Sequence, residues 1–240
     1  MSPDPPPGTG ATGAAVPEAV PAQLVAVLEE ARIRRLLGPM PLAEQVTHAR
    51  GFSQVAGRAP HRWMDLGSGG GIPGLVLAWL WPTSAAVLLD SAARRVQFLV
   101  EAVGTLGWEE RVSVVQARAE DAGRDPSLRG SFDLVVARSF GAPAVTAECA
   151  APLLCVGGRL VVSEPPDEDR VEPSPVTRDS SVGRLLRWPP EPLAQLGLEP
   201  VELVRHRFGY EVLRQIGLCP ERFPRRAGMA AKRPLYRSGT

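Results

Sequence analysis

Hydrophobic residues in the middle of the chain follow two alternating spacings. Short apolar runs of strand length end at Asp65, Asp90 and Gln116, and a fourth run covers 132–137. Between these runs, apolar residues recur every three or four positions, as they do on one face of a helix. This alternation predicts an α/β fold with a mostly parallel sheet and crossover helices.

The spacing also sets the limits of the expected elements. Helices are expected over 72–80, from an N-cap at Ser91 to about Leu106, and over 143–154. A turn at Gly157-Gly158 then leads into a fifth strand over 159–163.

Two flanking regions have different patterns. Residues 1–17 are mostly Pro, Gly, Ala and Thr, and we expect them to be disordered. Apolar positions after Pro21 and Pro41 predict two helices, the first ending near Gly38, in an N-terminal helical cap over 18–58. The α/β domain is expected over 59–218, followed by a basic tail over 219–240.

The end of the domain predicts an antiparallel pair of strands. A short helix is expected over 190–196, then strands over 201–208 and 211–216 with a turn at Gly209-Tyr210. Such a hairpin separates class I methyltransferases from ordinary dinucleotide-binding folds. The polar, proline-rich loop over 164–187 is either functional or disordered.

A glycine-rich loop follows the first strand and is typical of a nucleotide-type site. Gly69, Gly71 and Gly74 match the dinucleotide pattern, and Asp90 lies at the tip of the second strand, where it can bind a ribose. Asp65 precedes the first glycine of the loop, Gly67. An acid there favours the cationic methionine end of S-adenosylmethionine over a pyrophosphate, which requires N–H donors.

Two further positions are candidates for ligand contacts. After the third strand, Ala119 and Glu120 can bind an adenine edge through a backbone N–H or a carboxylate. After the fourth strand, Arg138 can contact the carboxylate of the methyl donor, a phosphate or a guanine edge. His48 and His61 are lone histidines, and neither is expected to be catalytic.

Overall charge gives little information about partners, because the net charge is +1. The tail is different: six Lys or Arg residues stand against Glu221, and Arg225, Arg226, Lys232 and Arg233 are candidate RNA contacts. A solvated basic tail is the alternative interpretation. The three cysteines form no metal-ligand pattern, so no metal is expected, and no run is long enough to cross a membrane. We expect a cytoplasmic protein.

Several of these motifs together resemble the RsmG (GidB) family in order and spacing. They are Asp65-Leu-Gly-Ser-Gly-Gly-Gly-Ile-Pro-Gly74, Arg94-Arg-Val-Gln-Phe-Leu99, Arg118-Ala119-Glu120, Ala137-Arg138-Ser139-Phe140, and the tail segments Phe223-Pro-Arg-Arg-Ala-Gly228 and Lys232-Arg-Pro-Leu235. The resemblance departs from the family after the fifth strand, where Ser163-Glu164-Pro165-Pro166 replaces a lysine-glycine ending.

The resemblance implies a class I, Rossmann-like methyltransferase with a seven-stranded sheet that uses S-adenosylmethionine. It implies methylation of N7 of a guanosine in 16S ribosomal RNA, with that RNA or the small ribosomal subunit as partner. It places Gly67, Ile72, Ala119 and Glu120 at the methyl donor and Arg138 at the junction with the substrate. Because N7 of guanine has a free lone pair, no proton-transfer residue is assigned. The alternatives are a small-molecule methyltransferase and a non-catalytic protein that binds S-adenosylmethionine or RNA.

Overall fold

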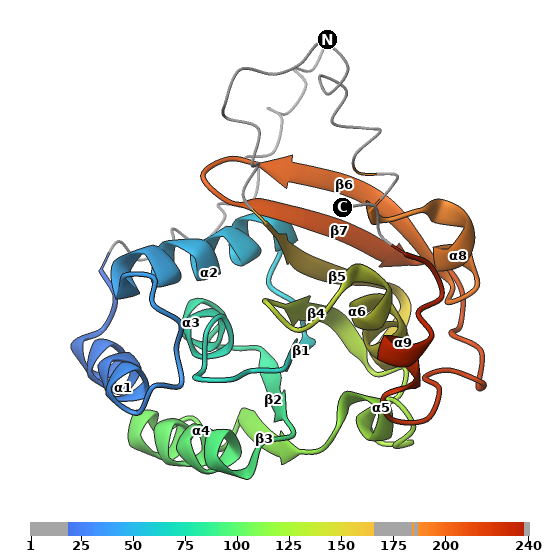
Figure 1. Ribbon diagram of the computed structural model, residues 1–240. Helices are drawn as coiled ribbons and strands as arrows, with labels where there is room; N and C mark the ends of the chain where they lie inside the picture. The colour runs from blue at the N-terminus through green and yellow to red at the C-terminus, as the bar shows by residue number, and fades with distance from the viewer. Residues whose placement is uncertain (1–18, 166–183, 185–186, 238–240) are drawn as a thin grey trace, which may run out of the picture.

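A seven-stranded sheet forms the centre of the molecule (Figure 1). The computed structural model describes residues 19–165, 184 and 187–237. The strand order is β3-β2-β1-β4-β5-β7-β6, in which β7 runs antiparallel between β5 and β6 and the other neighbours are parallel. The strands are β1 (Arg62–Leu66), β2 (Ala85–Asp90), β3 (Val112–Gln116), β4 (Phe132–Ala137), β5 (Leu154–Glu164), β6 (Leu198–Arg205) and β7 (Gly209–Gln215). The predicted fold class is confirmed.

Helices cover both faces of this sheet (Figure 1). One face carries α1 (Ala22–Ile33), α2 (Leu42–Ala56), α3 (Gly74–Leu80) and α4 (Ala93–Leu106). The other carries α5 (Ala119–Ala122), α6 (Pro143–Ala150), η1 (Ala151–Leu153), α8 (Pro190–Ala194) and α9 (Met229–Lys232). The sheet order turns back between β1 and β4, and in such sheets ligands bind outside the carboxyl ends of the strands at that point.

The two N-terminal helices share one hydrophobic core with the sheet. Leu28 of α1 and Phe52 of α2 are fully buried in the cluster that includes residues of β1, β4 and β7. Tyr210 of β7 donates a hydrogen bond to the carbonyl of His48 at 2.7 Å, which ties α2 to the sheet. The first helix ends at Ile33, earlier than the expected Gly38.

Two further local predictions were wrong. Helix α4 has its N-cap at Ala92 and not Ser91, and no side chain caps it. The N–H of Ala92 donates to the carboxylate of Asp90 at 2.9 Å. Gly157-Gly158 lies inside β5 as an irregularity in its pairing, and is not a turn before the strand.

The hairpin turn lies earlier than expected, at 206–208, where the N–H of His206 donates to the carbonyl of Phe208. Gly209 begins β7 and pairs with Arg205. A Cβ at Gly209 would lie 3.0 Å from Glu164 Cβ, so this glycine allows the close approach of β7 to β5 without a shift of the neighbouring side chain.

The C-terminal segment is folded onto the domain through residue 237. Arg129 donates to the carbonyls of Cys219, Pro220 and Phe223, and the Phe223 side chain is buried. The prediction of disorder over 1–17 and most of the 164–187 loop lie outside the described residues.

Within the described ranges, no helix is both long and apolar enough to cross a membrane.

Candidate functional site

The glycine-rich loop between β1 and α3 is fixed to the end of β2. The N–H groups of Gly67 and Ser68 both donate to the carbonyl of Leu89 at 2.9 Å, and the N–H of Gly69 donates to the carboxylate of Asp90 at 2.9 Å. Gly67, Gly69 and Gly71 have positive φ of 78°, 56° and 90°, which residues with a Cβ rarely adopt. The loop therefore presents its backbone next to Asp90.

Asp65 lies beneath this loop and does not line a cavity. Its side chain is fully buried, and one carboxylate oxygen accepts the N–H of Gly74 at 2.9 Å. The other oxygen has no hydrogen-bond partner among the described residues. Burial raises the pKa of Asp65 to about 7, against the opposing effect of the Gly74 hydrogen bond. Asp65 thus holds the start of α3 and supplies a buried acidic group under the loop.

Two adjoining cavities lie over the loop. The first, of about 210 Å³, is lined by residues that include Gly67, Asp90, Ala119 and Phe140. The second, of about 240 Å³, is lined by Leu36, Leu37, Gly38, Gln45, Gly67, Ser68, Gly69, Gly70, Ile72, Arg95, Arg138 and Ser139. Because Gly67, Arg95 and Ser139 line both cavities, the two form one groove across the carboxyl ends of β1, β2 and β4.

Two of the predicted donor-site residues have other contacts. Gly71 lines neither cavity, and a Cβ there would lie 2.5 Å from Leu75 Cδ1, so this glycine allows the loop to pack on α3. The Glu120 carboxylate accepts the N–H of Gly228 at 2.7 Å and so binds the C-terminal segment. At the start of α5, the first N–H groups have no partner within the helix, which leaves the backbone of Ala119 facing the first cavity.

A third cavity, of about 320 Å³, adjoins the groove at Arg138, Ser139 and Phe140. Arg138 donates to the side-chain oxygen of Gln45 at 3.2 Å. Burial lowers the pKa of Arg138, while the charge of Asp65 raises it. Arg138 therefore stands where the groove and the third cavity meet.

Two residues of α2 also reach this junction: Gln45, which the sequence analysis did not single out, and His48, which it treated as a lone histidine. Gln45 is buried and donates to the carbonyl of Met40 at 2.8 Å while it accepts from Arg138. His48 lines the third cavity, and its ring stacks on Phe208 at 4.3 Å between centroids. A signal was available: both polar residues lie on the side of α2 that carries the buried Ala49 and Phe52.

The imidazole of His48 is in an unusual environment. It is 8% exposed, and neither ring nitrogen has a hydrogen-bond partner in the described part of the chain. Burial, and then the charge of Arg138, lowers the pKa of His48 to about 4. The ring is therefore neutral at pH 7.

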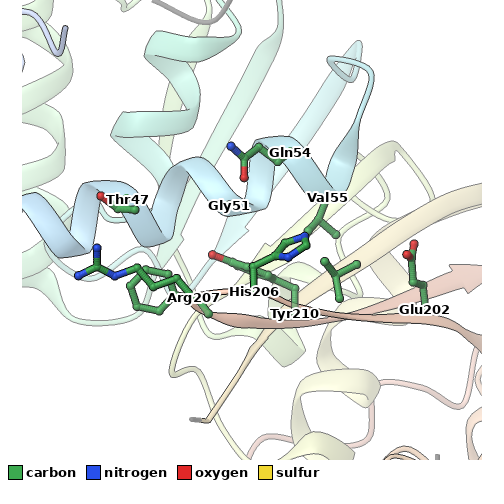
Figure 2. A pocket seen from close by; sticks show the side chains of 10 residues that line it. Thr47, Gly51, Gln54, Val55, Glu202, His206, Arg207 and Tyr210 are labelled. Carbon is green, nitrogen blue, oxygen red and sulfur yellow. The ribbon is translucent and has the colours of Figure 1, made fainter. Parts of the chain in front are cut away.

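A fourth cavity, of about 280 Å³, lies between α2 and the β6–β7 hairpin (Figure 2). Thr47, Gly51 and Gln54 approach it from the helix, and His206 and Tyr210 from the hairpin. Phe208 also lines it and stacks on His48, so aromatic rings separate this cavity from the third one. Its lining includes the ionisable residues Glu202, His206, Arg207 and Tyr210, but neither the glycine-rich loop nor Asp90.

The four predicted RNA contacts are not equivalent. Arg225 binds the buried carboxylate of Glu148 through its backbone N–H and its guanidinium, at 2.5 to 3.1 Å. The charge of Arg225 is therefore paired with that of Glu148 inside the protein. Arg226, Lys232 and Arg233 are exposed.

The groove fits S-adenosylmethionine. Its first cavity combines a carboxylate at the end of β2, suited to ribose hydroxyls, with the start of α5, suited to an adenine edge. A side chain at Gly67 would fill the space between the loop and Phe140, because a Cβ there would lie 2.7 Å from Phe140 Cδ2. Among the described residues, no group of three His, Cys, Asp or Glu side chains could hold a metal ion.

Solved structures with the same fold are methyltransferases. An O-methyltransferase from Bacillus cereus in complex with SAH superposes with a TM-score of 0.59 at 16% identity, over 82% of this chain and 92% of that one. The O-methyltransferase TomG from Streptomyces achromogenes, in complex with SAM, gives a TM-score of 0.57 at 17% identity, over 83% and 92%. The fold is that of class I S-adenosylmethionine-dependent methyltransferases.

Sequence comparison identifies the family. The GidB family profile, described as rRNA small subunit methyltransferase G, matches residues 44–168. Ribosomal RNA small subunit methyltransferase G from Pelotomaculum thermopropionicum is 37% identical over 172 residues, which is 72% of this chain and 69% of that protein. The protein of the same name from Rubrobacter xylanophilus is 37% identical over 186 residues, 76% of this chain and 68% of its own length. The chain therefore belongs to the rRNA small subunit methyltransferase G (GidB) family of S-adenosylmethionine-dependent methyltransferases.

Proposed function

We propose that this protein transfers the methyl group of S-adenosylmethionine to N7 of a guanosine in 16S ribosomal RNA. The observation that carries the proposal is the meeting of the donor groove and the third cavity at Arg138, in a chain of this family. The groove takes the methyl donor, and the third cavity takes the target base. The enzyme then acts where ribosomal subunits are assembled, in the cytoplasm.

On the donor side, different residues of the groove contact the ribose, the adenine and the methionine of S-adenosylmethionine. Asp90 binds the ribose hydroxyls, and the backbone N–H groups of Ala119 and Glu120 bind the adenine edge. The loop with Gly67, Gly69 and Ile72 faces the methionine end, above the buried carboxylate of Asp65. When bound, S-adenosylmethionine supplies a methyl group on a positively charged sulfur.

On the acceptor side, the reaction needs positioning more than proton transfer. Guanine N7 already carries a lone pair, so no base has to remove a proton. The side chains at the third cavity agree with this requirement: His48 is neutral, and Glu164 is bound by Arg187 and by the indole N–H of Trp188 at 2.9 Å. The residues of the chain hold the base in line with the methyl group and exclude water.

The C-terminal segment supplies charge for the RNA backbone. Arg226, Lys232 and Arg233 are exposed on a segment that is tied to α5 by Glu120 and to α6 by Glu148. Because α5 also lines the groove, these cations are held at a fixed place near the donor site.

The test is mass spectrometry of the nucleosides of 16S RNA from a strain that lacks this gene and from its parent. We expect the loss of one 7-methylguanosine, and its return when the wild-type gene is supplied. An unchanged nucleoside profile in the deletion strain would contradict the proposed substrate. Incubation of purified protein with small subunits from the deletion strain then shows whether this chain itself performs the transfer.

A small-molecule methyltransferase is the second candidate. It is favoured by the contacts of Glu164 with Arg187 and Trp188, which bring the chain after β5 to the edge of the third cavity. This alternative predicts S-adenosylmethionine binding without methylation of RNA. A calorimetric titration should show S-adenosylmethionine binding under either candidate, so it is the methylation of RNA that distinguishes the two.

A further inference from the structure

Ser139 has a backbone conformation that is rare for its residue type. It follows β4 directly and has φ of 53°, in the left-handed region. Among the described residues, Arg35 is the other non-glycine residue with positive φ. A residue with a Cβ loses stability in this conformation, and such residues concentrate at functional sites, where surrounding structure holds them.

The position of Ser139 in the site is also unusual. It lines the first cavity, the second cavity and the third cavity. The residue is exposed at this shared space and is not packed in the core. The place where three cavities meet is where a methyl group would pass from the donor to the base.

The left-handed turn sends the two neighbouring side chains to different partners. Arg138 reaches Gln45 on α2, at the edge of the third cavity. Phe140 lies against Gly67 of the glycine-rich loop, closely enough that a Cβ at Gly67 would be 2.7 Å from the ring. An extended or helical Ser139 would change the relative directions of these two side chains.

We propose that Ser139 is a positioning residue with two tasks. Its left-handed backbone places Arg138 on the acceptor side and Phe140 on the donor loop. Its small side chain leaves the space in which the edge of the target base approaches the methyl group. The second task rests on the proposed function, since it assigns the third cavity to the base.

Two substitutions test whether the backbone conformation and small size of residue 139 matter, or whether the serine hydroxyl itself is needed. Ser139→Gly keeps the left-handed backbone, removes the strain and keeps the space open. Ser139→Asn also tolerates this backbone, because asparagine is one of the residues that adopt it, but it adds volume at the transfer point. The matched control is Ser127→Asn, at an exposed serine beside the amino end of β1, on the opposite edge of the sheet.

The experiment measures kcat and KM for small ribosomal subunits, the Kd for S-adenosylmethionine and the midpoint of thermal unfolding. We expect Ser139→Gly to keep kcat within about threefold of wild type and to unfold at the same or a higher temperature. We expect Ser139→Asn to lower kcat by more than about tenfold, with a smaller change in Kd and an unchanged unfolding midpoint. A purely structural role would move the midpoint and leave kcat of the folded enzyme unchanged.

Two results would overturn the inference. Wild-type kcat in Ser139→Asn would show that the space beside residue 139 is not used by the base. Loss of activity in Ser139→Gly would show that the hydroxyl is needed, contrary to a role for backbone and size. A wild-type enzyme that fails to methylate the RNA would instead contradict the proposed function, so the two failures are distinguishable.

Discussion

The carboxylate of Asp65 is enclosed by protein on all sides, under the glycine-rich loop. Burial raises the pKa of Asp65 from the ordinary 3.8 to about 7. Between these two values the folded protein binds more protons at this residue than the unfolded chain does. The free energy of unfolding contributed by Asp65 is therefore largest in acid and is lost as pH rises from about 4 to about 7.

We predict that Asp65→Asn flattens this part of the pH dependence. Asparagine keeps an oxygen for the N–H of Gly74 but does not ionise. Urea unfolding at pH 5 and pH 8 should show a smaller loss of stability with pH in the variant than in wild type. Glu211, whose pKa burial also raises to about 7, contributes equally to both proteins. An identical pH dependence would mean that Asp65 does not titrate in this range.

Arg138 offers a second test at the residue scale. We predict that Arg138→Ala lowers methyl transfer by more than about tenfold, or about 1.4 kcal/mol of barrier, because it removes the charged group at the junction. The fold should remain intact, since Arg138 is joined to α2 by one hydrogen bond of 3.2 Å. Arg214→Ala, at an exposed arginine paired with Glu199 on the hairpin, is the matched control. Wild-type turnover in Arg138→Ala would exclude the role.

The glycine-rich loop and the acid at the end of β2 were predictable as structural features because their signal is local. A glycine between a strand and a helix, followed by an acid one strand later, already defines the loop and Asp90. Glu120 was not predictable in the same way. Its neighbours in sequence suggested an adenine contact through a backbone N–H or the carboxylate, but they gave no sign that the carboxylate accepts the N–H of Gly228, 108 residues away.

At the scale of elements, the C-terminal segment is attached by buried polar contacts. Glu148 of α6 is fully buried, and Arg225 neutralises it with a bidentate contact. Arg129 binds three carbonyls of the same segment. The segment therefore behaves as part of the domain, with its cations held on a fixed surface.

We predict that alanine at Arg225 lowers stability, whereas alanine at the adjacent Arg226 weakens RNA binding. Arg225→Ala leaves the buried Glu148 carboxylate without its cation and should lower the free energy of unfolding by about 3 kcal/mol. Arg226→Ala, at an exposed side chain, should leave stability unchanged and weaken RNA binding. Thermal unfolding and RNA titration of both variants test this pair. Equal stability of the two variants would contradict the structural role of Arg225.

At the scale of the whole molecule, a net charge of +1 gives no general attraction to RNA. The affinity for RNA must therefore depend on where the exposed positive charges lie on the surface. The exposed Arg226, Lys232 and Arg233 stand on the segment next to α5, while other exposed arginines such as Arg32 and Arg214 are paired with acids.

We predict that replacing Arg226, Lys232 and Arg233 together by alanine reduces the salt dependence of RNA affinity. Each phosphate contact to a single strand contributes about 0.7 to the slope of log K against log salt, so the slope should fall by about 2. The affinity is measured at several salt concentrations, with an Arg32→Ala, Arg214→Ala double variant as control. An unchanged slope would place the RNA contacts elsewhere.

The sequence by itself determined the order of strands and helices, the parallel core with its antiparallel C-terminal pair, the glycine-rich loop and Asp90. These features depend on local periodicity and on residues a few positions apart, which the chain displays directly. The tertiary structure decided which charged side chains are exposed, as Arg226 is, and which are paired inside the protein, as Arg225 is with Glu148. It also brought Gln45 and His48 to Arg138 and placed Ser139 between three cavities. These outcomes depend on which distant elements pack together, because burial and pairing are set by neighbours in space.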